Sequence, residues 1–493
     1  MDNYLEEVAK DKTLDPKDWT KVRALGHRMI DDMMDHLESI HEQPVWRVMP
    51  EAAKEYLSAT IPRDPDSMEN VYRDFKEYIL PYNKGNIHPR FFAWVQGTGT
   101  PFSMLAEMLA AGMNPNVTIG EHAPMYVDQQ VIEWCKQMLN FPSTGSGILL
   151  SGASMANITA LTVARDHQLG LNIRKHGIIA NNSRMFIYCS SETHSCVRKA
   201  AELLGLGTDS VVSISTDENY QIDCEILEFT IKGDLEKGYM PFAIVGNAGT
   251  VNTGAIDPLD KLSKIAKKYN LWFHIDGAFG ALAKLVPEYA PYLSAIENCD
   301  SVAFDLHKWM YLPYEVGCTL IKNAKAHRDS FAVNPEYLNS EERGLAGGLD
   351  PISNFGPELS RGFKALKVWM SLKEHGLDKF GEMISQNISQ AFYLESLVKE
   401  NDKLELITPV TLNIVCYRYF NSLLNHDQLN LLNKEVLIQL QEQGIAAPSS
   451  TVLNGIFAIR VCIVNQRSRM ADFETLARET IRIGDLLVST FNG

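Results

Sequence analysis

Seven short runs of apolar and β-branched residues recur between residues 147 and 321, and they constrain the fold more than any other feature. Each run is short enough for a strand, and a segment with helical spacing separates it from the next. A strand and a helix in repeated alternation form a largely parallel sheet covered by helices. The sequence therefore predicts an α/β fold around a seven-stranded, largely parallel sheet. The runs are GILLSG at 147–152, RMFIYCSS at 184–191, SVVSIS at 210–215, PFAIVGNAG at 241–249, LWFHIDGA at 271–278, SVAFDLH at 301–307 and VGCTLI at 316–321.

The two ends of the chain have other patterns. Residues 1–85 place apolar residues at helical spacing, which predicts an N-terminal helical arm. We expect residues 86–375 to form the large domain and residues 376–493 a smaller α+β domain, with strand-like runs LELITPV, LNIVCYRY and FAIRVCIVN. Residues 338–358 are rich in Gly, Pro, Ser and charge, so we expect a long loop of the kind that often serves as a lid.

Composition excludes several classes of protein. A net charge of −15 and a pI near 5.4 argue against a nucleic-acid partner, because phosphate backbones attract clustered lysine and arginine. The N-terminus lacks the basic start and apolar run of a signal peptide, and no apolar stretch approaches the roughly 20 residues that cross a bilayer. We expect a soluble, cytoplasmic protein that binds no membrane, with eight scattered cysteines that are reduced and bind no metal.

Two of the predicted strands end in residues that can carry chemistry. The run SVAFDLHKWMY ends in Asp305, His307 and Lys308, and α/β folds gather reactive groups at strand ends. A lysine among apolar and aromatic residues can have a lowered pKa and condense with an aldehyde, although such a lysine, taken alone, is more commonly a solvated loop residue. The run LWFHIDGAFG delivers Asp276, which would pair with a protonated pyridine nitrogen or, alternatively, cap the next helix.

Three further turns follow other strands. LLSGASMANITA runs from a strand into a helix, so backbone N–H groups and Ser154 can hold a phosphate at the helix N-terminus. Neither the Walker pattern nor G-x-G-x-x-G is present, which favours a cofactor with one phosphate over a nucleotide. His194 is either structural or stacks on a planar cofactor. Thr250 and Asp257 could form hydrogen bonds around the ring of that cofactor. These groups on successive strand ends suit one composite site.

This arrangement resembles the group II pyridoxal-dependent amino acid decarboxylases, which include aromatic L-amino acid, histidine and glutamate decarboxylases and have the aspartate aminotransferase-like fold, fold type I. The similarity runs from about residue 20 to 485. It implies that Lys308, in the motif HKW, carries pyridoxal 5′-phosphate as a Schiff base, with His307 beside it. It also implies the other cofactor contacts, which are Ala153 and Ser154 at the phosphate, His194 stacked over the ring, Thr250 near the ring substituents, Asp276 on the pyridine nitrogen and Ala278 under the ring.

The resemblance extends to residues around the substrate. NPEYL matches the mobile-loop motif of the family, so Tyr337 would protonate the substrate carbon after carbon dioxide leaves, at a place where similar aldehyde synthases tend to have Phe. Arg460 lies in the segment whose arginine faces the substrate carboxylate in glutamate decarboxylases. Trp94 stands in an aromatic position of the substrate wall and Gln96 in a polar one. Asp305 stands where many relatives have Asn near the phosphate, and a carboxylate there repels the phosphate unless a proton or donor intervenes.

The function expected from this resemblance is the decarboxylation of an L-amino acid to its amine and carbon dioxide. Trp94 and the segment around Tyr337 weigh more than Gln96, which favours an aromatic substrate. The alternatives are an acidic substrate such as glutamate, aspartate or cysteine sulfinate, an aldehyde-forming or transaminating reaction on the same cofactor, and a non-catalytic scaffold of Rossmann-like shape. Family members are similar homodimers with the site at the interface, so the resemblance implies a homodimer here.

Overall fold

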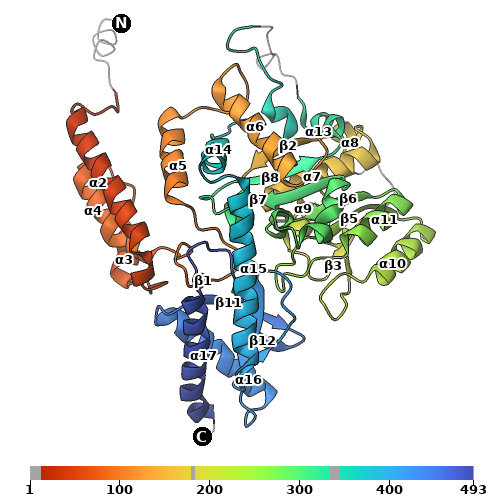
Figure 1. Ribbon diagram of the computed structural model, residues 1–493. Helices are drawn as coiled ribbons and strands as arrows, with labels where there is room; N and C mark the ends of the chain where they lie inside the picture. The colour runs from red at the N-terminus through yellow and green to blue at the C-terminus, as the bar shows by residue number, and fades with distance from the viewer. Residues whose placement is uncertain (1–12, 179–183, 334–342, 492–493) are drawn as a thin grey trace, which may run out of the picture. The chain divides into compact units, whose positions relative to one another are not determined.

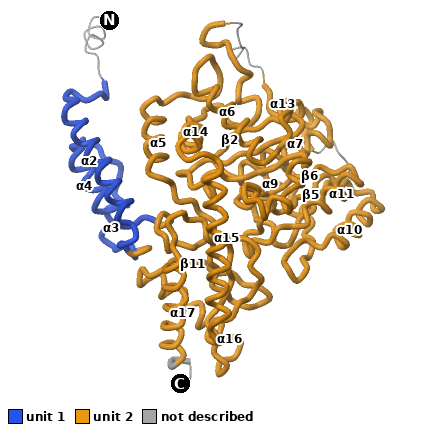
Figure 2. The backbone as a smooth tube through the Cα atoms, viewed as in Figure 1, with its two compact units in different colours: residues 1–43, 47–83 blue, residues 44–46, 84–493 orange. Residues whose placement is uncertain are grey.

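Two compact units make up the chain, whose computed structural model describes residues 13–178, 184–333 and 343–491 (Figures 1 and 2). Residues 1–43 and 47–83 belong to the first unit, and residues 44–46 and 84–493 to the second. The first unit contains helices α2 (Trp19–Glu38), α3 (Glu51–Leu57) and α4 (Met68–Asp74). The hydroxyl of Tyr72 on α4 donates to the carboxylate of Asp32 on α2 at 2.6 Å, which joins the two helices.

The second unit is built around a seven-stranded sheet, and each strand coincides with one of the predicted runs. Its order is β2-β8-β7-β6-β5-β3-β4. Strand β8 is antiparallel to β2 and β7, whereas β7, β6, β5, β3 and β4 run parallel. The predicted α/β fold with a largely parallel sheet is confirmed. The strands are β2 (Ser146–Leu150), β3 (Met185–Ser190), β4 (Val211–Ile214), β5 (Met240–Asn247), β6 (Trp272–Asp276), β7 (Ser301–Asp305) and β8 (Gly317–Ile321).

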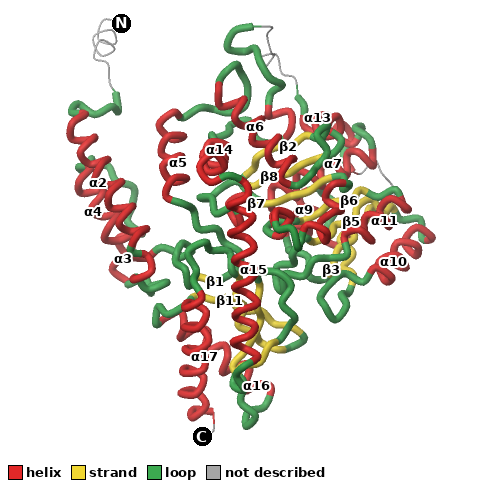
Figure 3. The backbone as a smooth tube through the Cα atoms, viewed as in Figure 1, coloured by secondary structure: helices red, strands yellow, loops and turns green. Residues whose placement is uncertain are grey.

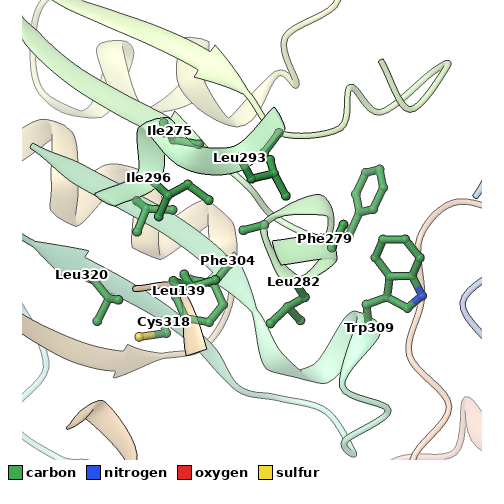
Figure 4. Close-up of a cluster of buried hydrophobic side chains, with 14 of the residues drawn as sticks. Leu139, Ile275, Phe279, Leu282, Leu293, Ile296, Phe304, Trp309, Cys318 and Leu320 are labelled. Carbon is green, nitrogen blue, oxygen red and sulfur yellow. The ribbon is translucent and has the colours of Figure 1, made fainter. Parts of the chain in front are cut away.

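Helices cover both faces of this sheet (Figure 3). Side chains of a strand point alternately to opposite faces, so Ile244 of β5 packs with α10 and α11, while Ala243 and Val245 pack with α7 and α9. Figure 4 shows part of the first cluster, where Phe304 of β7 lies near Leu139 and Leu282. The helices of this part are α5 (Pro101–Met113), α6 (Ala123–Met138), α7 (Ala153–Leu169), α8 (Ile173–His176), α9 (Cys196–Leu203), α10 (Cys224–Glu236), α11 (Leu259–Tyr269), α12 (Leu306–Trp309), α13 (Ala324–Phe331) and α14 (Ala365–His375).

A second sheet of five strands, in the order β1-β11-β12-β10-β9, lies mostly in the C-terminal part of the chain. Its core packs against three helices through Leu394, Leu432 and Phe473. The runs expected around residues 404, 412 and 457 form strands, whereas β1 and β11 were not predicted. The elements are β1 (Phe91–Phe92), β9 (Leu404–Leu406), β10 (Ile414–Tyr419), β11 (Ala447–Leu453), β12 (Ile456–Cys462), α15 (Leu377–Lys399), α16 (His426–Glu442) and α17 (Met470–Phe491). The division of the chain at residues 85 and 375 stays a prediction.

The described helices contain none that is long and apolar enough to cross a membrane. All eight cysteines are free thiols, and seven of them are buried, as expected for reduced structural cysteines. In the described part of the chain no cluster of three or more His, Cys, Asp or Glu side chains has an arrangement suited to a metal ion. The cytoplasmic location stays a prediction.

Candidate active site

A cavity of about 450 Å³ in the second unit opens at the carboxyl ends of the parallel strands. Parallel strands bring the residues that follow them to one edge of the sheet, which is where α/β folds place their ligands. The structure thus gathers most of the predicted site residues around one space. The predicted residues that line it are Trp94, Ala153, Ser154, His194, Asp276, Ala278, Asp305, His307 and Lys308.

Lys308 lies on the short helix α12, directly after β7. Its Nζ is 2.8 Å from Oδ2 of Asp305, whose side chain is buried. Burial lowers the pKa of Lys308, but the Asp305 carboxylate outweighs it, so that the pKa lies above its usual value. The strand end thus supplies a counter-ion three residues before the lysine, which acts against the lowering of the pKa considered from the sequence.

Asp305 also occupies the start of α7, where the phosphate was expected. Its Oδ1 accepts the N–H of Ala153 at 2.6 Å. The next N–H groups of the first turn have no acceptor within the helix, and the exposed Ser154 lines the cavity beside them. A phosphate therefore fits at Ser154 and the N–H groups of this turn, and Asp305 has two donors, Ala153 N–H and the Lys308 ammonium, that offset its charge.

The buried carboxylate of Asp276 ends β6 and faces the same cavity. Its Oδ1 accepts the N–H of Ala278 at 3.1 Å, and its Oδ2 lies 3.5 Å from the thiol of Cys196. His194 lines the cavity and accepts the N–H of Cys196 on Nδ1 at 3.2 Å. Burial lowers the pKa of His194, although Asp276 acts in the opposite direction, so its imidazole is neutral at pH 7.

His307 also lines the cavity, with its Nε2 3.7 Å from Oδ2 of Asp305. Burial lowers its pKa, and its Nδ1 lies 3.1 Å from the N–H of Val316. Its ring centre is 4.4 Å from that of Tyr314, a lining residue that the sequence did not single out. Asn247, Phe279 and Cys196 were missed as well. Asn247 ends β5, so the strand-end rule that found Asp276 would also have found Asn247.

Of the three predicted substrate-binding residues, one lines the cavity and the other two do not. Trp94 lines the cavity with 54% of its surface exposed, and the Lys84 Nζ lies 4.4 Å from its ring centre. Gln96 is half-buried and is not among the lining residues. The structure does not bring Arg460 into the cavity either, since this buried guanidinium donates four hydrogen bonds to the protein. Its acceptors are the carbonyl oxygens of Trp94, Val251 and Asn252 and the hydroxyl of Ser449.

Three other predicted residues do not contribute described side chains to the cavity. The hydroxyl of Thr250 is 2.9 Å from that of Thr253 and accepts the N–H of Ala255, so it fixes its own turn. The buried Asp257 accepts the N–H groups of Ile222 and Asn247, and burial raises its pKa to about 6. Tyr337 lies outside the described residues.

Comparison with known proteins identifies the family. Residues 50–420 match the model of the pyridoxal-dependent decarboxylase conserved domain. The chain belongs to this family. It is 33% identical to an aromatic-L-amino-acid decarboxylase of Bacillus atrophaeus, covering 91% of this chain and 92% of that protein. A phenylacetaldehyde synthase of a Rosa hybrid cultivar is 29% identical, with 93% of both chains covered. The structure of Oryza sativa TDC with PLP and tryptamine has the same fold, with a TM-score of 0.88 at 24% identity over 96% of this chain and all of that one.

The cofactor of this family fits the cavity that the residues build. Lys308 provides an amine, Asp276 a buried carboxylate for a pyridine nitrogen, and the start of α7 a place for a phosphate. The absence of a side chain at Gly317 allows the close packing at this phosphate site. A Cβ on Gly317 would lie 2.6 Å from Cα of Gly152 and 2.7 Å from Oδ1 of Asp305. The cofactor is pyridoxal 5′-phosphate, and the protein is a pyridoxal-phosphate-dependent amino acid decarboxylase of fold type I.

Proposed function

We propose that this decarboxylase acts on an aromatic L-amino acid and releases the corresponding amine. The charge of the cavity wall carries the proposal. Lys308 is the only lysine or arginine among the described residues that line the cavity, whereas Asp276, Asp305 and Glu315 bring three carboxylates. The side-chain carboxylate of glutamate or aspartate would meet no described lining cation other than Lys308, which Asp305 already pairs, and burying an unpaired charge is costly.

The apolar part of the same wall suits a flat ring. Trp94, Val95, Val251 and Phe279 line it, and aromatic rings gain from contact with one another beyond their buried area. Arg460, whose guanidinium binds the carbonyl oxygen of Trp94, is engaged by protein acceptors. The name of the Bacillus atrophaeus relative agrees with an aromatic substrate.

The chain's own residues have separate tasks in this reaction. Lys308 would hold the cofactor through Nζ, Ser154 and the start of α7 would hold its phosphate, and Asp276 would keep the proton on its pyridine nitrogen. Bound pyridoxal phosphate supplies the electron sink for the charge left at Cα when carbon dioxide departs. Asp305, at 2.8 Å, stabilises the ammonium form of Lys308 whenever its amine is released. The neutral His194 would offer a flat ring face above the cofactor.

The fate of Cα separates decarboxylation from aldehyde formation. By the family resemblance we assign the proton that reaches Cα to Tyr337, and this tyrosine favours the amine product over the aldehyde. A relative named phenylacetaldehyde synthase makes the aldehyde the second candidate. The two reactions differ in their products, so mass spectrometry of the product decides between them.

We further propose that the protein is a homodimer. Several large apolar side chains are exposed on helices of one chain, among them Trp19 and Val71 in the first unit and Met113 on α5 in the second. The family resemblance implies a homodimer, and these side chains are candidates for the surface that a second copy would cover.

The substrate proposal is tested by carbon dioxide release from tyrosine, tryptophan, histidine, glutamate, aspartate and cysteine sulfinate. We expect kcat/KM to be highest for tyrosine or tryptophan, and Trp94→Ala to raise KM for that substrate. A higher value for any of the three acidic substrates would contradict the proposal. Lys308→Ala should lose turnover and the absorbance band that borohydride bleaches in the wild type, whereas Lys322→Ala, an exposed lysine after β8, should keep both.

A further inference from the structure

We propose that Cys196 is a positioning residue for Asp276 and that a buried chain of hydrogen bonds, beginning at Trp272, fixes its thiol. The proposal concerns the cofactor site of the family and does not depend on which amino acid is the substrate. All six members of the chain are buried. The links are Trp272 Nε1 to Ser301 Oγ at 2.8 Å, Ser301 Oγ to His274 Nδ1 at 2.8 Å, His274 Nε2 to Asn157 Oδ1 at 2.6 Å, Asn157 Nδ2 to Cys196 Sγ at 3.4 Å and Cys196 Sγ to Asp276 Oδ2 at 3.5 Å.

The two ends of this chain favour one direction for its links. The Trp272 indole N–H can only donate, and an ionised carboxylate such as Asp276 can only accept. Ser301 accepts from the indole, and its own hydroxyl hydrogen can be donated to Nδ1 of His274. Burial lowers the pKa of His274 to about 4, against the effect of Asp276, so its ring is neutral and carries one hydrogen.

The single hydrogen of His274 then lies on Nε2 and is donated to the Asn157 carbonyl oxygen. The Asn157 amide therefore turns its NH₂ group towards Cys196. Burial, together with Asp276, raises the pKa of Cys196, so it remains a thiol rather than a thiolate. Its S–H is left to donate to Asp276.

The reverse direction is less favourable for two members of the chain. With the Asn157 amide turned round, the thiol would donate to Asn157 and Oδ2 of Asp276 would lose this donor. The Ser301 hydroxyl hydrogen would face the hydrogen on Nδ1 of His274 and have no acceptor among the described contacts of that hydroxyl. Each unpaired buried group costs about 1–3 kcal/mol, so the chain has one favoured direction.

This connection explains what a thiol contributes at this place. A thiol is a weak donor, so it fixes the rotamer of Asp276 while withdrawing less of the carboxylate's charge than an O–H or N–H group would. Asn157 belongs to α7, whose first turn is the proposed phosphate site, and Cys196 begins α9. The chain therefore ties both helices to the carboxylate that would face the pyridine nitrogen.

The first test measures the S–H bond itself. An infrared difference spectrum of wild-type holoenzyme minus Cys196→Ser isolates the S–H stretching band of Cys196. The same difference with Cys299→Ser gives a matched control, since the buried thiol of Cys299 donates to a backbone carbonyl, that of Ile296, at 3.3 Å. We expect the Cys196 band at lower frequency, because a charged acceptor makes the stronger hydrogen bond. A Cys196 band at or above that of Cys299 overturns the proposal.

The second test measures cofactor binding to the same proteins. Cys196→Ala should weaken the affinity for pyridoxal phosphate about tenfold, roughly the effect of one hydrogen bond to a charged group. Cys196→Ser, which keeps a donor, should stay within about threefold of the wild type, and Cys299→Ala should not change the affinity. Unchanged affinity in Cys196→Ala overturns the proposal, and so does an equal loss in Cys196→Ser. A shifted substrate preference in the panel above would affect only the proposed substrate.

Discussion

Arg460 lies beside the cavity, and its hydrogen bonds identify it as a support for the substrate wall. Its guanidinium binds the carbonyl oxygens of Trp94 and of two residues in the turn after β5, as well as the hydroxyl of Ser449. Trp94 has a φ of 54°, in the left-handed region that a bulky residue occupies only at a cost of about 1–2 kcal/mol. Ser449 also accepts the N–H of Trp94 at 3.2 Å, so both residues hold this strained peptide in place.

Replacing Arg460 should therefore affect stability as well as binding. Arg460→Met leaves buried carbonyl oxygens without donors, and we expect the free energy of unfolding to fall by about 2–4 kcal/mol in a urea titration. KM for the aromatic substrate should rise, because Trp94 loses its support. The matched control is Arg478→Met on the exposed face of α17, which should change stability by less than about 0.5 kcal/mol. A raised KM at unchanged stability would instead indicate a direct contact of Arg460 with the substrate.

The predicted site residues differ in how far sequence alone could place them. Asp276 ends a strand, and Lys308 and His194 lie within four residues of a strand end, so the geometry of a parallel sheet brings these positions together whatever the details of packing. Thr250 also follows a strand, but its rotamer turns the hydroxyl into its own turn. Cys196 was expected only to be one of eight reduced cysteines, since no pattern in the sequence indicates which neighbour a buried side chain will meet.

At the scale of elements, the start of α7 depends on the close approach of three segments. Gly152 precedes the helix, Gly317 begins β8, and Asp305 ends β7 between them. Gly317 has no room for a side chain, since a Cβ there would lie 2.6 Å from Gly152 and 2.7 Å from the Asp305 carboxylate. Strand β8 therefore packs directly against the proposed phosphate site.

Gly317→Ala should disturb that site while leaving the fold in place. The added methyl group must displace the first turn of α7 or Asp305, so we expect weaker binding of pyridoxal phosphate and a loss of about 1–3 kcal/mol in unfolding free energy. Fluorescence titration of the apoprotein with the cofactor measures the first effect. Gly233→Ala on α10, where a Cβ meets nothing within 4 Å, is the control and should stabilise the protein by about 0.5–1 kcal/mol. Unchanged cofactor affinity in Gly317→Ala would show that the close packing is not needed there.

Elements of the large sheet were predictable because its inner strands are buried on both faces and therefore read as apolar runs. Two strands of the smaller sheet were not predicted, for two different reasons. Strand β1 has two residues, Phe91–Phe92, which is too short for any periodicity. Strand β11 reads APSSTVL and begins with polar residues and a proline, a composition that is typical of a loop.

At the scale of the whole molecule, buried histidines make stability depend on pH. His327 lies between Ser146 and the carbonyl oxygen of Phe355, and burial lowers its pKa to about 4 from an ordinary value near 6.5. The unfolded chain binds a proton at this residue below about pH 6.5, whereas the folded chain binds it only near pH 4. The contribution of His327 is therefore complete above pH 6.5 and is lost as the pH falls towards 4.

We expect the stability difference between wild type and His327→Gln to shrink by about 3 kcal/mol between pH 7 and pH 4, which corresponds to 1.36 kcal/mol for each unit of pKa difference. Chemical denaturation at a series of pH values measures it. His426→Gln, which replaces an exposed histidine, serves as the control. A constant difference for His327→Gln would show that the folded protein accommodates the protonated imidazole.

Exposed apolar side chains of the first unit bear on whether the protein forms a homodimer. Ile61 and Val71 in the first unit are 73% and 58% exposed, and burying a side chain of this kind is worth about 1.5–3 kcal/mol. If a second copy covers them, Ile61→Asp combined with Val71→Asp should shift sedimentation from dimer towards monomer and make activity depend on protein concentration. Phe229→Asp on α10, whose ring is 79% exposed in the second unit, is the control for an isolated surface aromatic residue and should leave the dimer unchanged. A wild type that sediments as a monomer at micromolar concentration would contradict the dimer. All residues around the substrate would then belong to a single chain.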